Sequence, residues 1–592
     1  AGVIRADHET LAPIGHTLTN ANLEITLDAQ GTFLSARRVD KSERKILIPI
    51  TEESGGRTRA PAAHPLCDQL KYVAPQWEKE HDLYLTGLQH WALSEHSHPF
   101  LSAIYAYVSQ GTVLTDLLKS GVITLDAKGK YDEKQLVCWR VEGVSGQEPA
   151  CGKNRALMDA FAAYYLARIS VREPMLCMIE GKVTAVAEQH PKGIIPVNSN
   201  AKLISANDTT GFTYRGRFTT DAQAATVGYV ASQKAHNALR WLAAEQGVRD
   251  FVGNRVFLCW NPQGKQLMKP IGRVRRSDAP PKYDPSDYQS ALNSTLMSFR
   301  KDHQLQGTET AVLAAFDAAT TGRLAVTYYQ ELSLNTFFSR MQNWDAHCCW
   351  YTDKFGIQAP NLLQIVDCAF GVQQEERKNK RGGGENNQKK YVLKTDERIQ
   401  RQHVQRLLNC KISGGVFPQD VVQALIQRAS LPLGYDEGIW RRILTTACAA
   451  IQKYRFDTNQ GGNEMEWELD KRDRSFQFGR LLAVMERAEE DFYSQAKEDA
   501  RQTNAIKNLS EYRQRPLYVF ERVNRMLQQA YLPRIKQQHR DRYARLTGEI
   551  FAILREFPEE TMNQRLNENY LLGYELQRNV FFTKKETVKT EE

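Results

Sequence analysis

Residues 198–240 combine the side-chain types that contact nucleic acids. Short amide and hydroxyl side chains come first, arginines then alternate with aromatic rings, and a helix pattern with basic residues follows. Amides and hydroxyls can hydrogen-bond to base edges, arginines and lysines can hold phosphates, and aromatic faces can stack on bases. The candidates for base readout or strand separation are Lys202, Asn207, Thr209, Thr210, Tyr214, Arg215 and Arg217. The structural alternative is an Asx-rich turn that leads into an ordinary amphipathic helix.

A second candidate is the segment of residues 54–59, in which two glycines precede Arg57 and Arg59. A backbone without side chains can approach a phosphate or the floor of a groove closely. We therefore expect a flexible loop whose two arginines contact phosphates or bases. A solvated turn without a ligand is the alternative.

Basic residues are concentrated between residues 265 and 282. Six Lys and Arg face a single Asp there, a net charge of +5 out of +9 for the whole chain. A run of uncompensated cations suits the phosphate backbone, which carries no sequence information. The predicted backbone contacts are Arg273, Arg275 and Arg276, together with Lys234 and Asn237 on the preceding helix pattern.

Catalytic motifs are missing from the sequence. It contains no GxxxxGK[ST], HExxH, GxSxG or GxGxxG pattern. His81 and Asp82 stand alone, and His96 and His98 could share one face of a strand but lack a third ligand nearby. We therefore expect no catalytic residue, no metal site and no cofactor.

The composition is that of an ordinary soluble protein. Of 592 residues, 42% are hydrophobic and 25% charged, and no apolar stretch approaches the length of a membrane span. The ten cysteines form no CxxC pair, which favours buried thiols in a reducing compartment. No secretory leader is visible, although the chain does not begin with Met and residues can be missing in front. We expect a cytoplasmic protein.

The N-terminal part, residues 1–372, predicts a mixture of strands and helices. Residues 23–27 alternate and turn into a second run at Phe33, as in a β-hairpin. Further strands are expected at residues 103–108, 256–260 and 312–316, the last returning as a hairpin through residues 324–329. Helices are expected at residues 157–168 and 222–244. Residues 373–394 predict a mobile linker, because residues 373–390 contain three consecutive glycines, many charges and no apolar side chain.

The C-terminal part, residues 395–592, predicts an antiparallel helical bundle. Apolar stripes at helical spacing run over residues 478–492, 519–527 and 543–557, and Pro558 ends the third. Thr561 and Gln564 match a capping box for a last helix. The stripes are interpreted as core, and the fold class expected for the whole chain is α+β.

Several long segments resemble one protein family, the Csd-type large subunit of the type I-C CRISPR Cascade effector complex. The segments are HPLCD at 64–68, NAKLISANDTTGFTYRGRF at 200–218, ASQKAHNALRWL at 231–242, FLCWNPQGK at 257–265, RSFQFGRLL at 474–482 and YLLGY at 570–574. The resemblance spans nearly the whole chain.

The resemblance implies a subunit without catalytic activity. Such subunits read a short protospacer-adjacent motif (PAM) in duplex DNA, aid duplex opening and stabilise the R-loop. The implied partners are the crRNA-containing Cascade subunits (handle-binding, backbone and small subunits), target double-stranded DNA and a separate helicase–nuclease. Two alternatives stay open: a metal-dependent nuclease of the same systems and a scaffold that binds only RNA.

The resemblance also implies that the C-terminal end is a small-subunit-like part, because type I-C loci are thought to make their small subunit from inside the large-subunit gene. Met465 follows a polar, glycine-rich stretch at residues 457–463 and precedes every later apolar stripe. A product that starts at Met465 would contain residues 465–592. We expect translation to start at Met465, because a start at Met485 would remove part of the first apolar stripe, residues 478–492.

Overall fold

The computed structural model describes residues 11–57, 60–125, 129–205, 218, 221–244, 248–274, 282, 284–318, 320, 322–352, 356–376, 391–461, 464–496 and 502–583. The chain divides into two compact units, and each is described by itself. The first comprises Ala1–Arg249, Asn254–Leu258 and Ala314–Tyr328, and the second comprises Asp250–Gly253, Cys259–Leu313 and Tyr329–Glu592. The predicted boundary at residue 372 falls inside the second unit.

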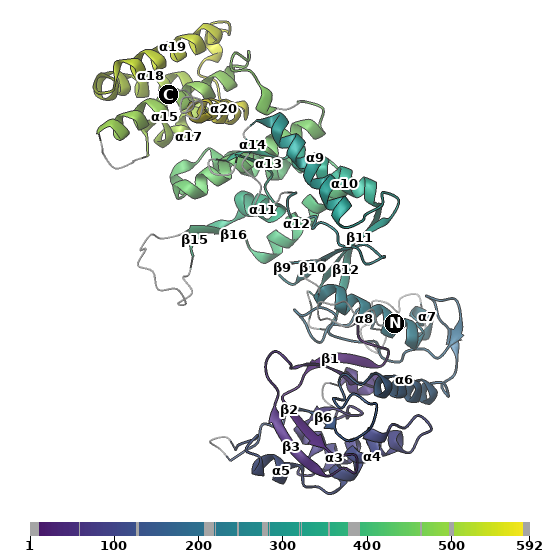
Figure 1. Cartoon of the computed structure of the whole chain (residues 1–592). Helices are drawn as coiled ribbons and strands as arrows, with labels where there is room; N and C mark the ends of the chain where they lie inside the picture. Colours follow the sequence, from purple (N-terminus) through teal and green to yellow (C-terminus); the bar gives the residue numbers. More distant parts are fainter. Residues whose placement is uncertain are drawn as a thin grey trace. The chain divides into compact units, whose positions relative to one another are not determined.

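Small sheets and helices alternate through the first 244 residues (Figure 1). The strands are β1 (His16–Asn20), β2 (Leu23–Leu27), β3 (Phe33–Arg38), β4 (Lys45–Pro49), β5 (Asp68–Gln69), β6 (Leu136–Val141), β7 (Met175–Leu176) and β8 (Val183–Thr184). The helices are α1 (Glu52–Gly56), α2 (Leu70–Val73), α3 (Glu78–Ala92), α4 (Pro99–Ser109), α5 (Val113–Lys119), α6 (Arg155–Ile169), α7 (Asp221–Ala224) and α8 (Tyr229–Ala244).

The main sheet of the first unit has the order β3–β2–β6–β5, and β1 pairs with β4 in a separate ribbon. Strand β2 is antiparallel to β3 and parallel to β6, so the predicted hairpin at residues 23–38 is confirmed. Asp28 holds its turn by accepting the backbone N–H of Thr32 at 2.7 Å. One core joins this sheet to α3, α4 and α6, with Trp91 and Phe161 in edge contact at 5.0 Å.

The predicted strand at residues 103–108 is wrong, because these residues belong to helix α4. Pro99 occupies the first helical turn, and His98 caps the helix by accepting the backbone N–H of Phe100. An apolar run of this length fits a buried helix as well as a buried strand, and the flanking cap decides between them. His98 is thus a capping residue and not part of a strand.

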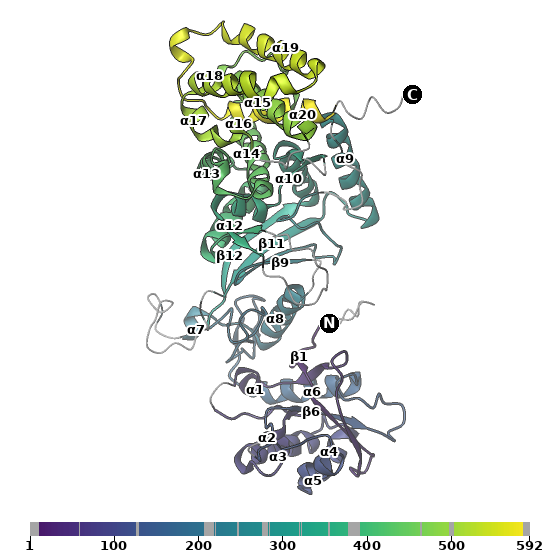
Figure 2. The ribbon, with the colours of Figure 1, turned by 90° about the vertical axis from the view of Figure 1, so that its left-hand side faces the viewer.

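Helices dominate the second unit, and Figure 2 shows them from a second direction. Strands β9 (Arg249–Val252), β10 (Arg255–Trp260), β11 (Thr310–Asp317) and β12 (Ala325–Ser333) form a four-stranded sheet in the order β12–β11–β10–β9, and the residues of these strands are divided between the two units. Short pairs follow: β13 (Trp350–Thr352) with β14 (Gly356–Gln358), and β15 (Val372–Glu375) with β16 (Tyr391–Lys394). The predicted neighbours at residues 312–316 and 324–329 are confirmed as β11 and β12.

The remaining helices include three that match the predicted stripes at residues 478–492, 519–527 and 543–557. They are α9 (Pro285–Asp302), α10 (Leu334–His347), α11 (Leu362–Phe370), α12 (Glu397–Ser413), α13 (Gln419–Ala429), α14 (Glu437–Asp457), α15 (Arg474–Ala496), α16 (Asn504–Lys507), α17 (Leu509–Gln514), α18 (Pro516–Met526), α19 (Gln537–Leu554) and α20 (Asn569–Thr583). A π-helical turn, η4 (Leu527–Tyr531), extends α18. The α+β class is therefore confirmed.

The predicted capping box at Thr561 and Gln564 is wrong. Thr561 ends a short 3-10 turn, and helix α20 begins only at Asn569. The backbone N–H of Gln564 donates to the carbonyl of Thr561 at 2.9 Å, so the two residues close a turn and do not open a helix.

Helices α15 and α20 cross at two glycines. A Cβ at Gly479 would lie 2.0 Å from the carbonyl oxygen of Tyr570, and one at Gly573 would lie 2.1 Å from that of Phe476. These distances exclude any side chain, because real Cβ atoms do not approach a backbone oxygen so closely. The RSFQFGRLL and YLLGY segments thus meet at one helix crossing.

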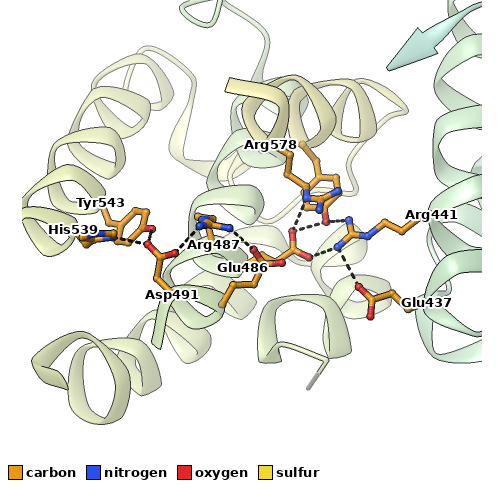
Figure 3. Close-up of polar contacts among 10 residues, drawn as sticks. Glu437, Arg441, Glu486, Arg487, Asp491, His539, Tyr543 and Arg578 are labelled. Atoms are coloured by element: carbon orange, nitrogen blue, oxygen red, sulfur yellow. Dashed lines mark hydrogen bonds and ion pairs between the residues drawn. The ribbon is translucent and has the colours of Figure 1, made fainter. Parts of the chain in front are cut away.

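A buried polar network links α14, α15, α19 and α20 (Figure 3). Glu486 on α15 accepts from Arg441 Nη2 at 2.7 Å and lies 3.3 Å from Arg578 Nε. Tyr574 also donates its hydroxyl to Glu486, at 2.5 Å. Asp491, about one turn further along α15, lies 2.7 Å from Arg487 and 2.6 Å from His539. Burial would raise the pKa of Glu486, but the charges of Arg441 and Arg578 outweigh it and lower that pKa.

Met465, the expected internal start, lies in the short 3-10 turn Glu464–Glu466 ahead of α15. Its side chain is buried. Residues before Met465 contact residues after it. Arg441 on α14 forms an ion pair with Glu486, and Ser430 and Tyr570 share a hydrogen bond of 2.7 Å. A separate product would lose these contacts to the preceding helices, and the internal start stays a prediction.

Two global properties complete the fold. All ten cysteines are free thiols, nine of them buried. Among the described residues, no helix has the length and apolar character that a membrane span requires.

Candidate nucleic-acid interface

A basic cavity of about 600 Å³ lies in the first unit. Its walls come from β1, β4, α1, the irregular residues 192–199 and α8. Four cationic side chains line it, those of Lys45, Arg57, Lys192 and Arg240. The described residues of its lining include neither Asp nor Glu. The volume is typical of ligand sites, and the lining favours an anion.

Arg57 is held at the cavity by an ion pair, which makes the prediction of a flexible loop wrong for residues 54–57. Residues Glu52–Gly56 form helix α1, capped by reciprocal hydrogen bonds between Thr51 and Ser54. The Arg57 guanidinium donates to both oxygens of buried Asp68, at 2.8 and 2.6 Å, and lies 4.6 Å from the centre of the Tyr72 ring. Burial would lower the pKa of Arg57, but Asp68 outweighs it and raises that pKa. Arg57 still lines the cavity, so its contact with nucleic acid stays a prediction.

His64 presents a neutral ring to the cavity. Burial lowers its pKa to about 4, so the imidazole is uncharged near pH 7. Its Nδ1 lies 2.9 Å from the hydroxyl of Ser54. Asp68 accepts the backbone N–H of His64 and does not touch the imidazole. Because the Ser54 side chain is buried and already serves the cap of α1, this pair is not arranged as an exposed nucleophile and base.

Lys192 and Arg240 are cations without a carboxylate partner in the described part of the chain. Lys192 donates its Nζ to the carbonyl of Arg57 at 2.8 Å, and Arg240 donates to the carbonyl of Lys192. Burial lowers the pKa of Arg240 to about 10. Burial, followed by the nearby charges of Lys202 and Arg57, also lowers the pKa of Lys192. A phosphate in the cavity would supply the missing negative charge and reverse both shifts.

Lys202 lies next to this pair in the fold. Its backbone forms an antiparallel bridge with Lys192, and its N–H donates to the carbonyl of Gly322 at 3.1 Å. Burial lowers the pKa of Lys202, partly opposed by the charge of Glu52. The structure therefore brings Lys202 close to the cavity, as a third cation that lacks full compensation.

Helix α8 places its two predicted residues differently. Lys234 is exposed. Asn237 is buried and donates its side-chain N–H groups to the carbonyls of Ala12 and Pro13, each at 3.1 Å. It also accepts from Arg240 at 3.1 Å. Asn237 thus fixes the N-terminal segment and Arg240, and a direct contact with a DNA backbone would require these bonds to break.

The basic strip at residues 265–282 belongs to the second unit and is partly neutralised. Lys265 pairs with Glu309, and Lys269 pairs with Asp250 at 3.1 Å. Arg273 is exposed and donates to the side-chain oxygen of Gln358 at 2.6 Å. Fewer free cations therefore face solvent than the local net charge of +5 suggests.

A comparison with protein-family models matches residues 3–582 to the family described as CRISPR-associated protein (Cas_Csd1). The chain belongs to the Csd1 family of CRISPR-associated proteins. The predicted resemblance to a type I-C Cascade large subunit is thereby confirmed. A search of curated proteins gave no match.

Much of the predicted site of this Csd1 protein lies outside the described residues. This is the case for Arg59, Asn207, Thr209, Thr210, Tyr214, Arg215, Arg217, Arg275 and Arg276. Their contacts with DNA stay predictions. Within the described residues, no group of three or more His, Cys, Asp or Glu could hold a metal ion.

Neither Lys45 nor Lys192 could be predicted from the sequence as part of the site. No local window gave a signal, because the cavity takes single cations from segments that are far apart in the chain. Lys45 precedes an ordinary apolar strand, and Lys192 stands alone between Pro191 and Gly193. Only the pairing of β1 with β4 and the packing of α8 bring them together.

Proposed function

We propose that this Csd1 protein is the non-catalytic Cascade subunit that recognises the PAM in duplex DNA. The observation that supports it best is the basic cavity of the first unit, whose described lining holds four cations and no carboxylate. Such a lining attracts the phosphate backbone and is unsuited to binding a catalytic divalent cation. The neutral donors and acceptors of Asn207, Thr209 and Thr210 would read base edges.

In this proposal the division of labour follows that of other guided systems. Base pairing with the crRNA selects the target, and the protein reads only a short duplex motif before the strands separate. The chain aids duplex opening, and its C-terminal helices stabilise the R-loop. Its partners are the crRNA-containing subunits, the target duplex and the helicase–nuclease that the complex recruits.

Removing cations from the cavity is expected to weaken DNA binding without changing motif preference. In the assembled complex, the Lys45→Ala, Lys192→Ala double variant should flatten the plot of log affinity against log salt, by up to about one unit for each lost phosphate contact. Binding of PAM-matched and scrambled duplexes, measured at several salt concentrations, checks this. Lys79→Ala is the control, because Lys79 is exposed on α3 between two glutamates and lies outside the cavity. An unchanged salt slope together with lost motif preference would contradict the assignment.

Asn207→Ala tests motif readout. Loss of a side chain that hydrogen-bonds to a base edge should cost about 1–3 kcal/mol on the preferred motif and little on a scrambled one. Competition binding with the two duplexes measures the difference. Equal losses on both would assign Asn207 to a structural Asx turn.

Each of the two alternative functions can be tested with the same purified protein. Cleavage of a labelled duplex by the purified chain with Mg²⁺ or Mn²⁺ would support a nuclease. Affinity that is independent of any duplex motif, with RNA bound in preference to DNA, would support a scaffold that binds only RNA.

A further inference from the structure

A second cavity, of about 530 Å³, lies among the C-terminal helices of the second unit. Helices α15, α18 and α19 and the π-helical turn η4 line it. Figure 1 and Figure 2 both show α18 and α19 beside each other. The predicted role of these helices as bundle core leaves this opening unexplained. π-Helical turns often occur at functional sites.

The floor of this cavity is apolar and aromatic. Met485 is buried there, and Phe520 and Phe551 pack against each other with ring centres 5.0 Å apart. The rim is polar. Asn524 and Gln528 line it and make no hydrogen bond with a described side chain. An aromatic floor beneath free amide groups suits a flat heterocycle with polar edges, such as a nucleobase.

The surroundings are strongly basic. Residues 513–545 contain nine Lys and Arg against two Asp and Glu, a net charge of +7. Arg540 lines the cavity, and its buried Nε has no hydrogen-bond partner. Arg525, Arg534 and Arg555 are exposed to solvent. Asp541 carries the one carboxylate among the described residues of the lining, and it accepts from Gln537 at 2.8 Å. These charges favour the binding of a polyanion over the binding of a protein surface that carries both positive and negative charges.

We propose that this cavity binds one unstacked base of single-stranded DNA, with the adjoining phosphates held by the arginines of α18 and α19. The inference rests on the proposed function, because the strand would be the one displaced when the duplex opens. The base stacks on the aromatic floor, and Asn524 and Gln528 contact its edge without demanding one base type. The guanidinium of Arg540, which also donates to the side chain of Gln537, adds positive charge to the lining.

Gly548 gives a direct test, because a Cβ at this position on α19 meets nothing within 4 Å and the glycine lines the cavity. Gly548→Leu should fill the base site without a clash, whereas Gly548→Ala should leave it open. Using the full chain and a 20-residue oligothymidylate, we expect Gly548→Leu to weaken binding about 5- to 100-fold, the loss of one stacked base. Gly548→Ala should bind like the unsubstituted chain. A 2-aminopurine within the oligonucleotide should brighten on binding to the unsubstituted chain and to Gly548→Ala, because it leaves the stack of its neighbours, and should brighten less with Gly548→Leu.

The controls separate this inference from the proposed function. Arg540→Gln, a second change on α19, should weaken binding of the same oligonucleotide in a chain whose thermal unfolding is unchanged. PAM-matched and scrambled duplexes are measured on every variant. If motif preference persists while Gly548→Leu binds oligothymidylate normally, the base site is overturned and the proposed function stands. If no chain prefers the motif but Gly548→Leu loses single-strand binding, the proposed function fails and the site stands. A loss seen only with the matching RNA would overturn the assignment to DNA.

Discussion

Replacing Glu486 by alanine is expected to lower the free energy of unfolding of the C-terminal helices by about 3–5 kcal/mol. The side chain of Glu486 is 3% exposed and joins Arg441 of α14 to Arg578 of α20 (Figure 3). Both arginines are largely buried, at 13% and 12% exposure. Without the carboxylate, two buried cations would lose the partner they share, and the exposed Glu437 and the neighbouring Glu575 would compensate them less closely. Urea unfolding of the full chain, followed by circular dichroism, measures the loss.

Glu437→Ala is the matched control, because Glu437 contacts the same guanidinium. It lies 3.8 Å from Arg441 Nη2, but its side chain is 66% exposed. Solvent screens exposed ion pairs, so the expected change is below about 0.5 kcal/mol. Equal effects of the two substitutions would show that burial of the Glu486 carboxylate does not determine the stability of this helix junction.

Helix periodicity predicted the C-terminal part well. The stripes at residues 478–492, 519–527 and 543–557 correspond to α15, α18 and α19. Each of these helices is long enough for apolar spacing to identify the buried face without knowledge of its partner. The crossing of α15 and α20 could not be predicted in the same way, because it depends on Gly479 and Gly573 meeting across nearly a hundred residues.

The predictions from sequence were wrong where a short segment fits two local structures. Residues 103–108 are apolar on all sides, which fits a buried strand or a buried helix, and the cap at His98 decided for α4. Two glycines before Arg57 suggested a mobile loop, but the Thr51–Ser54 capping box folds them into α1. Asp68, eleven residues further on, then takes up the Arg57 guanidinium. The residues immediately around Arg57 therefore give no sign that Asp68 will be its partner.

The candidate site was predicted only in part. Polar and basic side chains in one segment drew attention to Lys202, which does lie beside the cavity. The cations that complete the cavity come from β4, the irregular residues 192–199 and α8. Charge is the right signal for such a site, but its concentration in space, and not along the chain, is what a polyanion encounters.

Glu464 is expected to make the stability of the second unit depend on pH. Its side chain is fully buried at the junction before α15, and neither carboxyl oxygen has a hydrogen-bond partner in the described part of the chain. Burial raises its pKa to about 7, a shift that its own backbone and the charges of Arg455 and Lys471 only partly oppose. The folded chain therefore binds this proton more tightly than the unfolded chain does. Stability should be fullest below about pH 4.5 with respect to this group, and it should fall as the pH rises toward 7.

Glu464→Gln should remove this dependence, because the amide resembles the protonated carboxyl at every pH. At pH 8 the variant should be more stable than the unsubstituted chain by up to about 3 kcal/mol, and near pH 4.5 the two should differ little. Urea unfolding at pH 4.5, 6, 7 and 8 gives the two curves. Glu468→Gln, which changes an exposed carboxylate four residues away, should follow the unsubstituted chain throughout. Parallel curves for Glu464→Gln and the unsubstituted chain would mean that the buried carboxyl gains a partner when it ionises. In that case its burial at the start of the C-terminal helices would carry no pH-dependent cost.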